Sequence, residues 1–320
     1  MVKIAEGAYG CVYSPALPCS RKKLARDTPS VGKVFSTMED ASIEFSNMQI
    51  VRELDPEGEF SVPLQERCNI NSTKADGCGL SIEGRTTPQL TYDYGGASLH
   101  DVIRMGGYSL MPMLPGLAKV ANGLHVLSKA GYVHRDVKES NIVWDGQRAR
   151  MRLIDFGMMI KKSAVYETDQ VDVLGYDYEY YPPEFKIYYH GSVLRDGLGN
   201  VSDLNQFIAA DLRSMYSYTS ELVELNPYGI LERVVADLVD NKEPTALSRN
   251  LSRLAHKIDV FGFGIILERL INHADQLPRR TRAKLVGIAR SCTNPNPMDR
   301  MSIQECEKAL LALHALHKKK

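Results

Sequence analysis

The chain has no long apolar run, no excess of either charge and no paired cysteine motif. Within its 320 residues the most apolar stretch, residues 261–267, is far shorter than the roughly 18 residues that a membrane-spanning helix needs. Lysine plus arginine and aspartate plus glutamate both total 39, so the charge balance indicates neither a nucleic-acid nor a membrane partner. The first residues lack the charged-then-apolar pattern of a signal peptide. We expect no nucleic-acid or membrane binding.

Cysteine is scarce and scattered. The six cysteines are Cys11, Cys19, Cys68, Cys78, Cys292 and Cys306, and no two form a C-x-x-C pair. Zinc binding by the first four is an alternative, but their spacing does not fit a known zinc module. The sequence therefore predicts reduced thiols and, with no secretory signal, a reducing compartment such as the cytoplasm.

A dense group of polar residues lies near the middle of the chain. It comprises the carboxylates of Asp136 and Asp155, the ammonium of Lys138 and the carboxamide of Asn141. Two apolar runs on either side of a turn at residues 145–147 predict a β-hairpin, which would bring Asn141 and Asp155 to one point. Carboxylate and amide oxygens suit Mg²⁺. A further aspartate and lysine beside such a metal suit phosphoryl transfer.

The same stretch matches the H-R-D-x-K-x-x-N and D-F-G motifs of protein kinases letter for letter. The chain therefore resembles a eukaryotic-type Ser/Thr protein kinase. The runs at residues 9–19 and 181–187 also resemble kinases of large nucleocytoplasmic DNA viruses, which would place the protein in the host cytoplasm or the virion.

The resemblance implies an α+β, two-lobed fold over residues 1–313. A small antiparallel β N-lobe would span residues 1–94, and a mainly helical C-lobe residues 95–313. A helical insertion at about 187–256 would either dock a partner or pack on the C-lobe. Residues 314–320 would form a basic tail.

The resemblance also assigns an ATP site. Its residues are Ala5, Gly7, Gly10, Val12, Val31, Lys33, Glu44, Tyr92, Asp93, Gly95 and Val143. Ala5 replaces the first glycine of the kinase glycine-rich loop. Lys33 would pair with the α- and β-phosphates, with Lys22 and Lys23 as alternatives. Glu44 would hold Lys33, with Glu53 as the alternative.

The remaining roles concern catalysis, the metal and structural support. Asp136 would accept or orient the substrate hydroxyl, Lys138 would neutralise charge, and Asn141 and Asp155 would ligate Mg²⁺. The residues assigned to regulation or structure are Arg135, Phe156, Gly157, Thr168, Glu184, Asp259 and Arg300. In this set, Asp259 would hold the backbone of the catalytic loop and Arg300 would pair with Glu184.

Two details bear on regulation and specificity. Arg135 suggests a response to phosphorylation of the activation loop, with Ser163, Tyr166 and Thr168 as candidate acceptors. Lys138 is typical of Ser/Thr kinases, whereas Asp177 stands where such kinases carry a threonine. The tyrosines around Asp177 would shape the substrate pocket or simply pack.

The sequence thus predicts an ATP-dependent protein kinase that acts on Ser/Thr hydroxyls of protein substrates with Mg-ATP. The main alternative is a nucleotide-binding pseudokinase scaffold without turnover. A kinase for small molecules is a weaker alternative, because such enzymes generally lack the Pro-Pro-Glu motif, here residues 182–184, and the late arginine, here Arg300.

Overall fold

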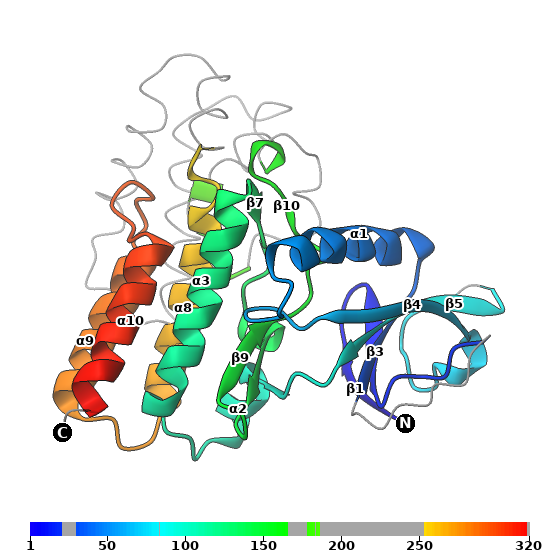
Figure 1. Cartoon of the computed structure of the whole chain (residues 1–320), viewed down its shortest axis with the longest axis horizontal. Coiled ribbons are helices and arrows are strands. Elements are labelled where there is room, and N and C mark those ends of the chain that lie inside the picture. Colours follow the sequence, from blue (N-terminus) through cyan, green and yellow to red (C-terminus); the bar gives the residue numbers. More distant parts are fainter. Residues whose placement is uncertain (21–29, 83, 166–177, 183, 186–252, 319–320) are drawn as a thin grey trace, which may run out of the picture. The chain divides into compact units, whose positions relative to one another are not determined.

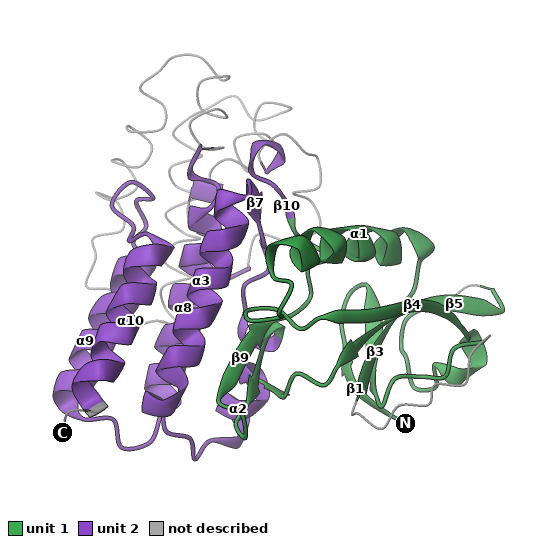
Figure 2. Cartoon of the chain, in the orientation of Figure 1, with its two compact units in different colours: residues 1–98, 141–159 green, residues 99–140, 160–320 purple. Residues whose placement is uncertain are grey.

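In this computed structural model the described residues are 1–20, 30–82, 84–165, 178–182, 184–185 and 253–318. They form two compact units (Figures 1 and 2), one of residues 1–98 with 141–159 and one of residues 99–140 with 160–320. The first carries an antiparallel sheet and the second most of the helices, which confirms the predicted α+β fold class. The predicted insertion lies outside the described residues, except for residues 253–256.

The first unit is built on a five-stranded antiparallel sheet with the order β1-β2-β3-β5-β4. Its strands are β1 (Val2–Glu6), β2 (Gly10–Ser14), β3 (Ser30–Phe35), β4 (Leu64–Asn71) and β5 (Thr86–Asp93). A short 3₁₀ helix, η1 (Ser72–Lys74), follows β4. Strand β4 lies wholly within residues 63–88, whereas β5 begins there and continues into residues 89–96, the segment that resembles the kinase hinge.

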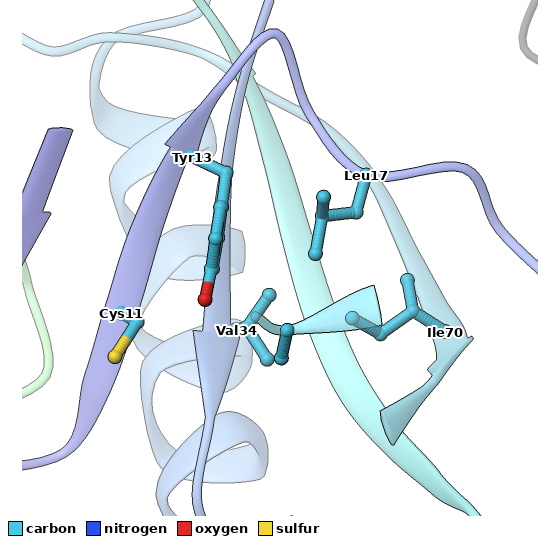
Figure 3. Close-up of a cluster of buried hydrophobic side chains, with 6 residues drawn as sticks. Cys11, Tyr13, Leu17, Val34 and Ile70 are labelled. Atoms are coloured by element: carbon cyan, nitrogen blue, oxygen red, sulfur yellow. The ribbon is translucent and has the colours of Figure 1, made fainter. Parts of the chain in front are cut away.

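Hydrophobic residues cover both faces of this sheet. Successive side chains of a strand point to opposite faces, so Val34 and Phe35 of β3 belong to different clusters. One cluster holds Val34 with Cys11, Tyr13, Leu17, Ile70 and Ala75 (Figure 3). The other joins Phe35 and Leu90 of the sheet to Ala41 of helix α1 (Met38–Leu54). The sheet and α1 therefore share a core that fixes the position of β3.

Helix α1 begins at a conventional N-cap. The Thr37 side chain accepts a hydrogen bond from the backbone N–H of Asp40 at 3.1 Å, which satisfies one of the unpaired N–H groups of the first turn. The carboxylates of Glu39 and Asp40 lie in that turn, where the helix dipole favours negative charge.

We expect Thr37→Ala to destabilise the protein by about 1 kcal/mol, because the capping hydrogen bond to the Asp40 N–H is lost. Thr37→Ser keeps the hydroxyl and is the matched control. Urea unfolding of the two variants would measure the difference. Equal stability of the Ala and Ser variants would contradict the capping role.

The predicted hairpin is present and belongs to the first unit. Strands β8 (Ile142–Asp145) and β9 (Arg150–Leu153) pair antiparallel, and β6 (Ala97–Ser98) pairs with β8. The hairpin is joined to the rest of the unit through Leu153, whose N–H donates to the Phe60 carbonyl at 2.7 Å and whose carbonyl accepts from Val62 N–H at 3.2 Å.

The second unit is mainly helical. Its longer elements are α2 (Leu99–Met105), α3 (Leu114–Lys129), α8 (Lys257–His273), α9 (Arg279–Cys292) and α10 (Ile303–Lys318). The short elements are η2 (Met111–Met113), β7 (Tyr132–Val133), η3 (Glu139–Asn141), which continues into the first unit, β10 (Ile160–Lys161) and η4 (Lys162–Ala164). Helix α3 packs against α10, and α8 against α9.

Glycine makes the contact between α8 and α9 possible. A Cβ atom on Gly264 would lie 2.7 Å from the Cβ of Cys292, closer than two carbon atoms can pack. Helix α10 continues to Lys318, into the residues predicted to form a basic tail. No helix among the described residues is long and apolar enough to cross a membrane.

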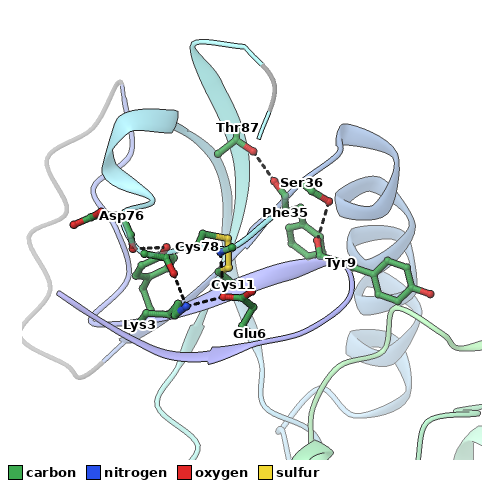
Figure 4. Close-up of a disulfide and its surroundings, with 12 residues drawn as sticks. Lys3, Glu6, Tyr9, Cys11, Phe35, Ser36, Asp76, Cys78 and Thr87 are labelled. Atoms are coloured by element: carbon green, nitrogen blue, oxygen red, sulfur yellow. Dashed lines mark hydrogen bonds and ion pairs between the residues drawn. A yellow bond between two sulfur atoms is a disulfide. The ribbon is translucent and has the colours of Figure 1, made fainter. Parts of the chain in front are cut away.

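Four of the six cysteines form disulfides. Cys11 of β2 is bonded to Cys78 (Figure 4), and Cys19 is bonded to Cys68. The prediction of reduced thiols is therefore wrong for these four residues, and the zinc alternative fails with it. Cys292 and Cys306 are free and buried. The compartment stays a prediction, and the cysteines no longer support it.

Candidate active site

Lys33 lies at the centre of a buried ion cluster in the first unit. Its Nζ contacts Glu44 Oε2 at 2.6 Å and Asp155 Oδ1 at 2.8 Å. Strand β3 supplies the lysine and α1 the glutamate, whereas the aspartate follows β9. The hydroxyl of Tyr92 in β5 donates to the other oxygen of Glu44, Oε1, at 2.8 Å. The structure therefore pairs Lys33 with Glu44, and Glu53 has no part in this contact.

The charges in this cluster stabilise one another. Burial alone would lower the pKa of Lys33, but the carboxylates of Asp155 and Glu44 raise it above its ordinary value, so the ammonium is kept. Burial raises the pKa of the Glu44 carboxyl, and the charge on Lys33 opposes that shift. The side chains of Lys33 and Glu44 are 12% and 3% exposed, whereas that of Asp155 is 33% exposed. Asp155 is thus the member of the cluster that solvent or a ligand can reach.

The residues predicted to contact ATP lie on neighbouring parts of the same sheet. Ala5 pairs with Val12 across β1 and β2, and Val12 pairs with Lys33 across β2 and β3. The turn between β1 and β2 is closed by a 2.9 Å hydrogen bond from Gly7 N–H to the Gly10 carbonyl. Ala5, which replaces the first glycine of the kinase loop, is therefore an extended residue that is paired in the sheet where the loop begins.

The hinge-like segment adds a second group of predicted ATP residues. Val31 pairs with Tyr92, and Asp93 is the last residue of β5 and pairs with Ser30. A Cβ atom on Gly95 would lie 2.6 Å from Cγ2 of Val143, so only glycine allows this approach. The hinge-like segment and the hairpin therefore meet at Gly95 and Val143, which are both among the residues predicted to form the ATP site.

Asn141 and Asp155 flank the hairpin as the sequence predicts. Ile142 pairs with Leu153, and the N–H of Ile154 donates to the Asn141 carbonyl at 3.0 Å. The two residues are therefore held at the same end of the β8–β9 ladder. Their carboxamide and carboxylate oxygens are hard donors of the type that Mg²⁺ prefers.

The two residues after Asp155 are held against α1. Phe156 is 1% exposed, and its carbonyl accepts a hydrogen bond from Asn47 Nδ2 at 2.7 Å. A second bond of 3.0 Å runs from Asn47 Nδ2 to the Met159 carbonyl. A Cβ atom on Gly157 would lie 3.3 Å from Glu44 Oε2. Asn47 was not anticipated, although it follows Glu44 by three residues, the spacing of one helical face.

The second unit holds the predicted catalytic loop. Lys138 Nζ contacts Asp136 Oδ2 at 2.8 Å. The Asp136 side chain is 8% exposed and that of Lys138 is 29% exposed. A carboxylate in contact with an ammonium can accept a proton from a substrate hydroxyl.

Asp259 at the start of α8 holds the backbone of this loop, as predicted. Its two carboxylate oxygens accept hydrogen bonds from the N–H groups of His134 at 2.8 Å and Arg135 at 2.9 Å. Arg135 adopts a left-handed backbone conformation with φ of +66°, which is costly for a residue with a side chain. Burial raises the pKa of Asp259, while these hydrogen bonds and His134 lower it.

The predicted pair of Glu184 and Arg300 is also present. Arg300 donates to the two Glu184 oxygens at 2.7 and 2.9 Å, and both side chains are almost fully buried. Such a bidentate pair has a fixed geometry as well as a favourable charge interaction. It joins the segment before α8 to the chain that precedes α10.

One contact at Asp136 was missed in the sequence. The Tyr178 hydroxyl donates to Asp136 Oδ1 at 2.5 Å. The sequence shows a run of tyrosines here, and pocket shaping or packing was proposed for them, but no local pattern predicts which one reaches Asp136.

Thr168, Tyr166, Asp177 and the alternative lysines Lys22 and Lys23 lie outside the described residues. Ser163 is in η4.

Comparisons with known proteins point the same way. Residues 87–191, about a third of the chain, match the protein-family model of the protein kinase domain. The serine/threonine-protein kinase pkn2 of Myxococcus xanthus is 34% identical over 95 residues, which cover 28% of this chain and 11% of that protein. The chain therefore spans about a tenth of that relative's length. The resemblance to viral kinases is not tested by these matches. Together with the contacts of Lys33 and Asp136, the matches support a eukaryotic-type protein kinase domain in this chain.

Proposed function

We propose that the protein is an ATP-dependent protein kinase that transfers the γ-phosphate of Mg-ATP to Ser or Thr hydroxyls of protein substrates. The observation that carries the proposal is the ion cluster in which Lys33 contacts both Glu44 and Asp155. Active kinases require the strand lysine to be paired with the helix glutamate and the D-F-G aspartate to be in place. A scaffold that keeps these residues for folding alone has no need of the complete set.

The first unit supplies the groups for the nucleotide. Lys33, held by Glu44, is a cation of fixed position that can bind phosphate oxygens, and the turn closed by Gly7 and Gly10 offers backbone N–H groups to them. Val12, Val31 and Val143 would cover the adenine. Asn141 and Asp155 would hold Mg²⁺, which when bound neutralises charge on the phosphate oxygens.

The second unit supplies the groups for the acceptor. Asp136 would take the proton of the substrate hydroxyl as that oxygen attacks phosphorus. Lys138, 2.8 Å from Asp136, would neutralise negative charge on the transferred group. Arg300 and Glu184, together with Asp259, support this unit without touching the reacting atoms.

Specificity and setting are parts of the same proposal. Lys138 favours Ser/Thr acceptors, and the relative from Myxococcus xanthus carries the name of a Ser/Thr kinase. We propose a protein substrate, with neither nucleic acid nor membrane as a partner, and a cytoplasmic setting, which for a viral protein would be the host cytoplasm or the virion. Regulation by phosphorylation near Arg135 is proposed from its position alone.

The test is transfer of labelled γ-phosphate from Mg-ATP to generic Ser/Thr protein substrates. We expect transfer by the wild-type protein and a loss of at least about a hundredfold in Asp136→Ala, because a positioned general base is worth that much or more. Asp101→Ala, at an exposed position in α2, is the matched control and should keep full activity. Phosphoamino-acid analysis should give phosphoserine or phosphothreonine.

Other results would point to other functions. An absence of transfer, with Mg-ATP still raising the melting temperature, would favour the scaffold. Phosphotyrosine as the main product would overturn the Ser/Thr assignment. Transfer that persists in Asp136→Ala would mean that Asp136 is not the base.

A further inference from the structure

Tyr178 occupies one oxygen of the proposed catalytic base. Its hydroxyl donates to Asp136 Oδ1 at 2.5 Å, while Lys138 Nζ contacts Oδ2 at 2.8 Å. The Lys138 ammonium also lies 5.8 Å from the centroid of the Tyr178 ring, within the range of a cation–π contact. The Tyr178 phenol therefore donates to Asp136 the same kind of hydrogen bond that a substrate hydroxyl must donate before its proton is removed.

The residues after Tyr178 are anchored, so this contact does not depend on one hydrogen bond. The Tyr180 hydroxyl donates to the buried carboxylate of Glu139, and Arg269 of α8 donates to the Tyr180 oxygen at 2.6 Å. Arg269 also forms ion pairs with Glu139 and Glu179. Two residues of the segment are thus tied to the catalytic loop and to α8.

The aromatic rings add to this anchoring. The Tyr178 ring lies 5.2 Å from that of Tyr180 and 4.9 Å from that of Tyr181, the latter edge-on. Pairs of this geometry are favourable beyond the area that they bury. The ring of Tyr178 is therefore held in the position from which its hydroxyl reaches Asp136.

We propose that Tyr178 is an autoinhibitory pseudo-acceptor, whose hydroxyl holds Asp136 Oδ1 until a protein substrate displaces it. The proposal rests on the proposed kinase function. It makes the displacement of one tyrosine a condition for substrate binding, and a substrate that moves Tyr178 would be favoured over one that does not.

One observation favours inhibition over a role in positioning Asp136, and the pKa of Tyr178 is consistent with it. Lys138 already contacts the other oxygen of the carboxylate, so Tyr178 is not needed to hold it. Burial, followed by the charge and hydrogen bond of Asp136, raises the pKa of the Tyr178 phenol, which therefore stays protonated at neutral pH. It remains a donor and does not become a base.

The test compares Tyr178→Phe with the wild type in steady-state kinetics. We expect kcat/KM for the protein substrate to rise about tenfold, through a lower KM for that substrate, because a hydrogen bond to a charged group no longer has to be broken. The KM for ATP should not change. Tyr108→Phe is the matched control, since its hydroxyl donates to the Leu270 carbonyl at 2.8 Å in the same unit.

A stability measurement tests the contact without any need for activity. Tyr178→Phe should lower the melting temperature of the wild type but not that of Asp136→Ala. Each of the two substitutions removes the same hydrogen bond, so the second has nothing further to remove. Additive effects would mean that the contact is absent and would overturn the proposal.

The kinetic outcomes separate the two proposals. An active wild type with an unchanged or lower kcat/KM in Tyr178→Phe would overturn the inhibition and leave the kinase function standing. An absence of transfer in both proteins would overturn the kinase function, and the inhibition with it. Transfer by Tyr178→Phe alone would support both.

Discussion

Replacing Lys33 with methionine should lower phosphate transfer by about 100- to 1000-fold, the usual effect of removing one preorganised group that stabilises transition-state charge. Methionine matches the length of the lysine stem but cannot contact Glu44, Asp155 or a phosphate oxygen. Lys74→Met, at an exposed position of η1, is the control for a lost surface lysine. Transfer by Lys33→Met within tenfold of the wild type would contradict the role given to Lys33.

Lys33→Met should also destabilise the protein. A second variant separates this effect on stability from the effect on phosphate transfer. The Glu44 side chain is 3% exposed, and a buried carboxylate left without its charged partner costs about 3–5 kcal/mol. A Lys33→Met/Glu44→Gln variant removes both charges and should recover most of that stability in urea unfolding. It should stay inactive, because its loss of activity comes from the missing ammonium and not from unfolding.

The pairs that could be predicted from sequence are those in which motif order assigns both partners. Glu44 and Glu53 were both possible partners for Lys33, and helical register decides between them, because α1 turns Glu44 to the buried side and ends at Leu54. The contacts of Arg300 with Glu184 and of Asp259 with the catalytic loop were predicted in the same way. The hairpin before Asp155 could be predicted from its alternating apolar runs and turn.

The contacts that could not be predicted are made by segments without a regular sequence pattern, because the path of the chain there cannot be inferred from the residues alone. Tyr178 reaches Asp136 because Glu179 and Tyr180 are anchored to Arg269 and Glu139, and nothing in the local sequence marks these partners. The helical continuation to Lys318 was missed because three terminal lysines resemble a frayed end.

Cysteine pairing was missed for a related reason. Nothing in the spacing of the cysteines indicates that Cys11 and Cys78 have Cα atoms 5.8 Å apart. That distance follows from the register of β2 in the sheet and from the turn after η1, which places Cys78 against the cluster that contains Cys11 (Figures 3 and 4). Only the folded unit shows that the geometry allows a bond.

We expect loss of either disulfide to destabilise the protein by roughly 2–4 kcal/mol, because each one closes a loop in the unfolded chain. The sequence separations are 67 residues for Cys11 and Cys78 and 49 for Cys19 and Cys68. The second loop lies inside the first, so one bond already shortens the loop that the other closes. Losing both should therefore cost more than the sum of the two single losses, because the second loss frees a full loop that no other bond shortens.

Alkylation of the denatured protein without reductant tests the bonds directly, and two reactive thiols are expected, those of Cys292 and Cys306. The Cys11→Ala/Cys78→Ala variant should melt at a lower temperature than the wild type, and a reductant should lower its melting temperature further. Cys292→Ala is the control for a buried cysteine outside the disulfides. Six reactive thiols would mean that all the cysteines are reduced, as the spacing of the cysteines predicts. With two reactive thiols, the first unit, and with it the strand that carries Lys33, would depend for its stability on the redox potential around it.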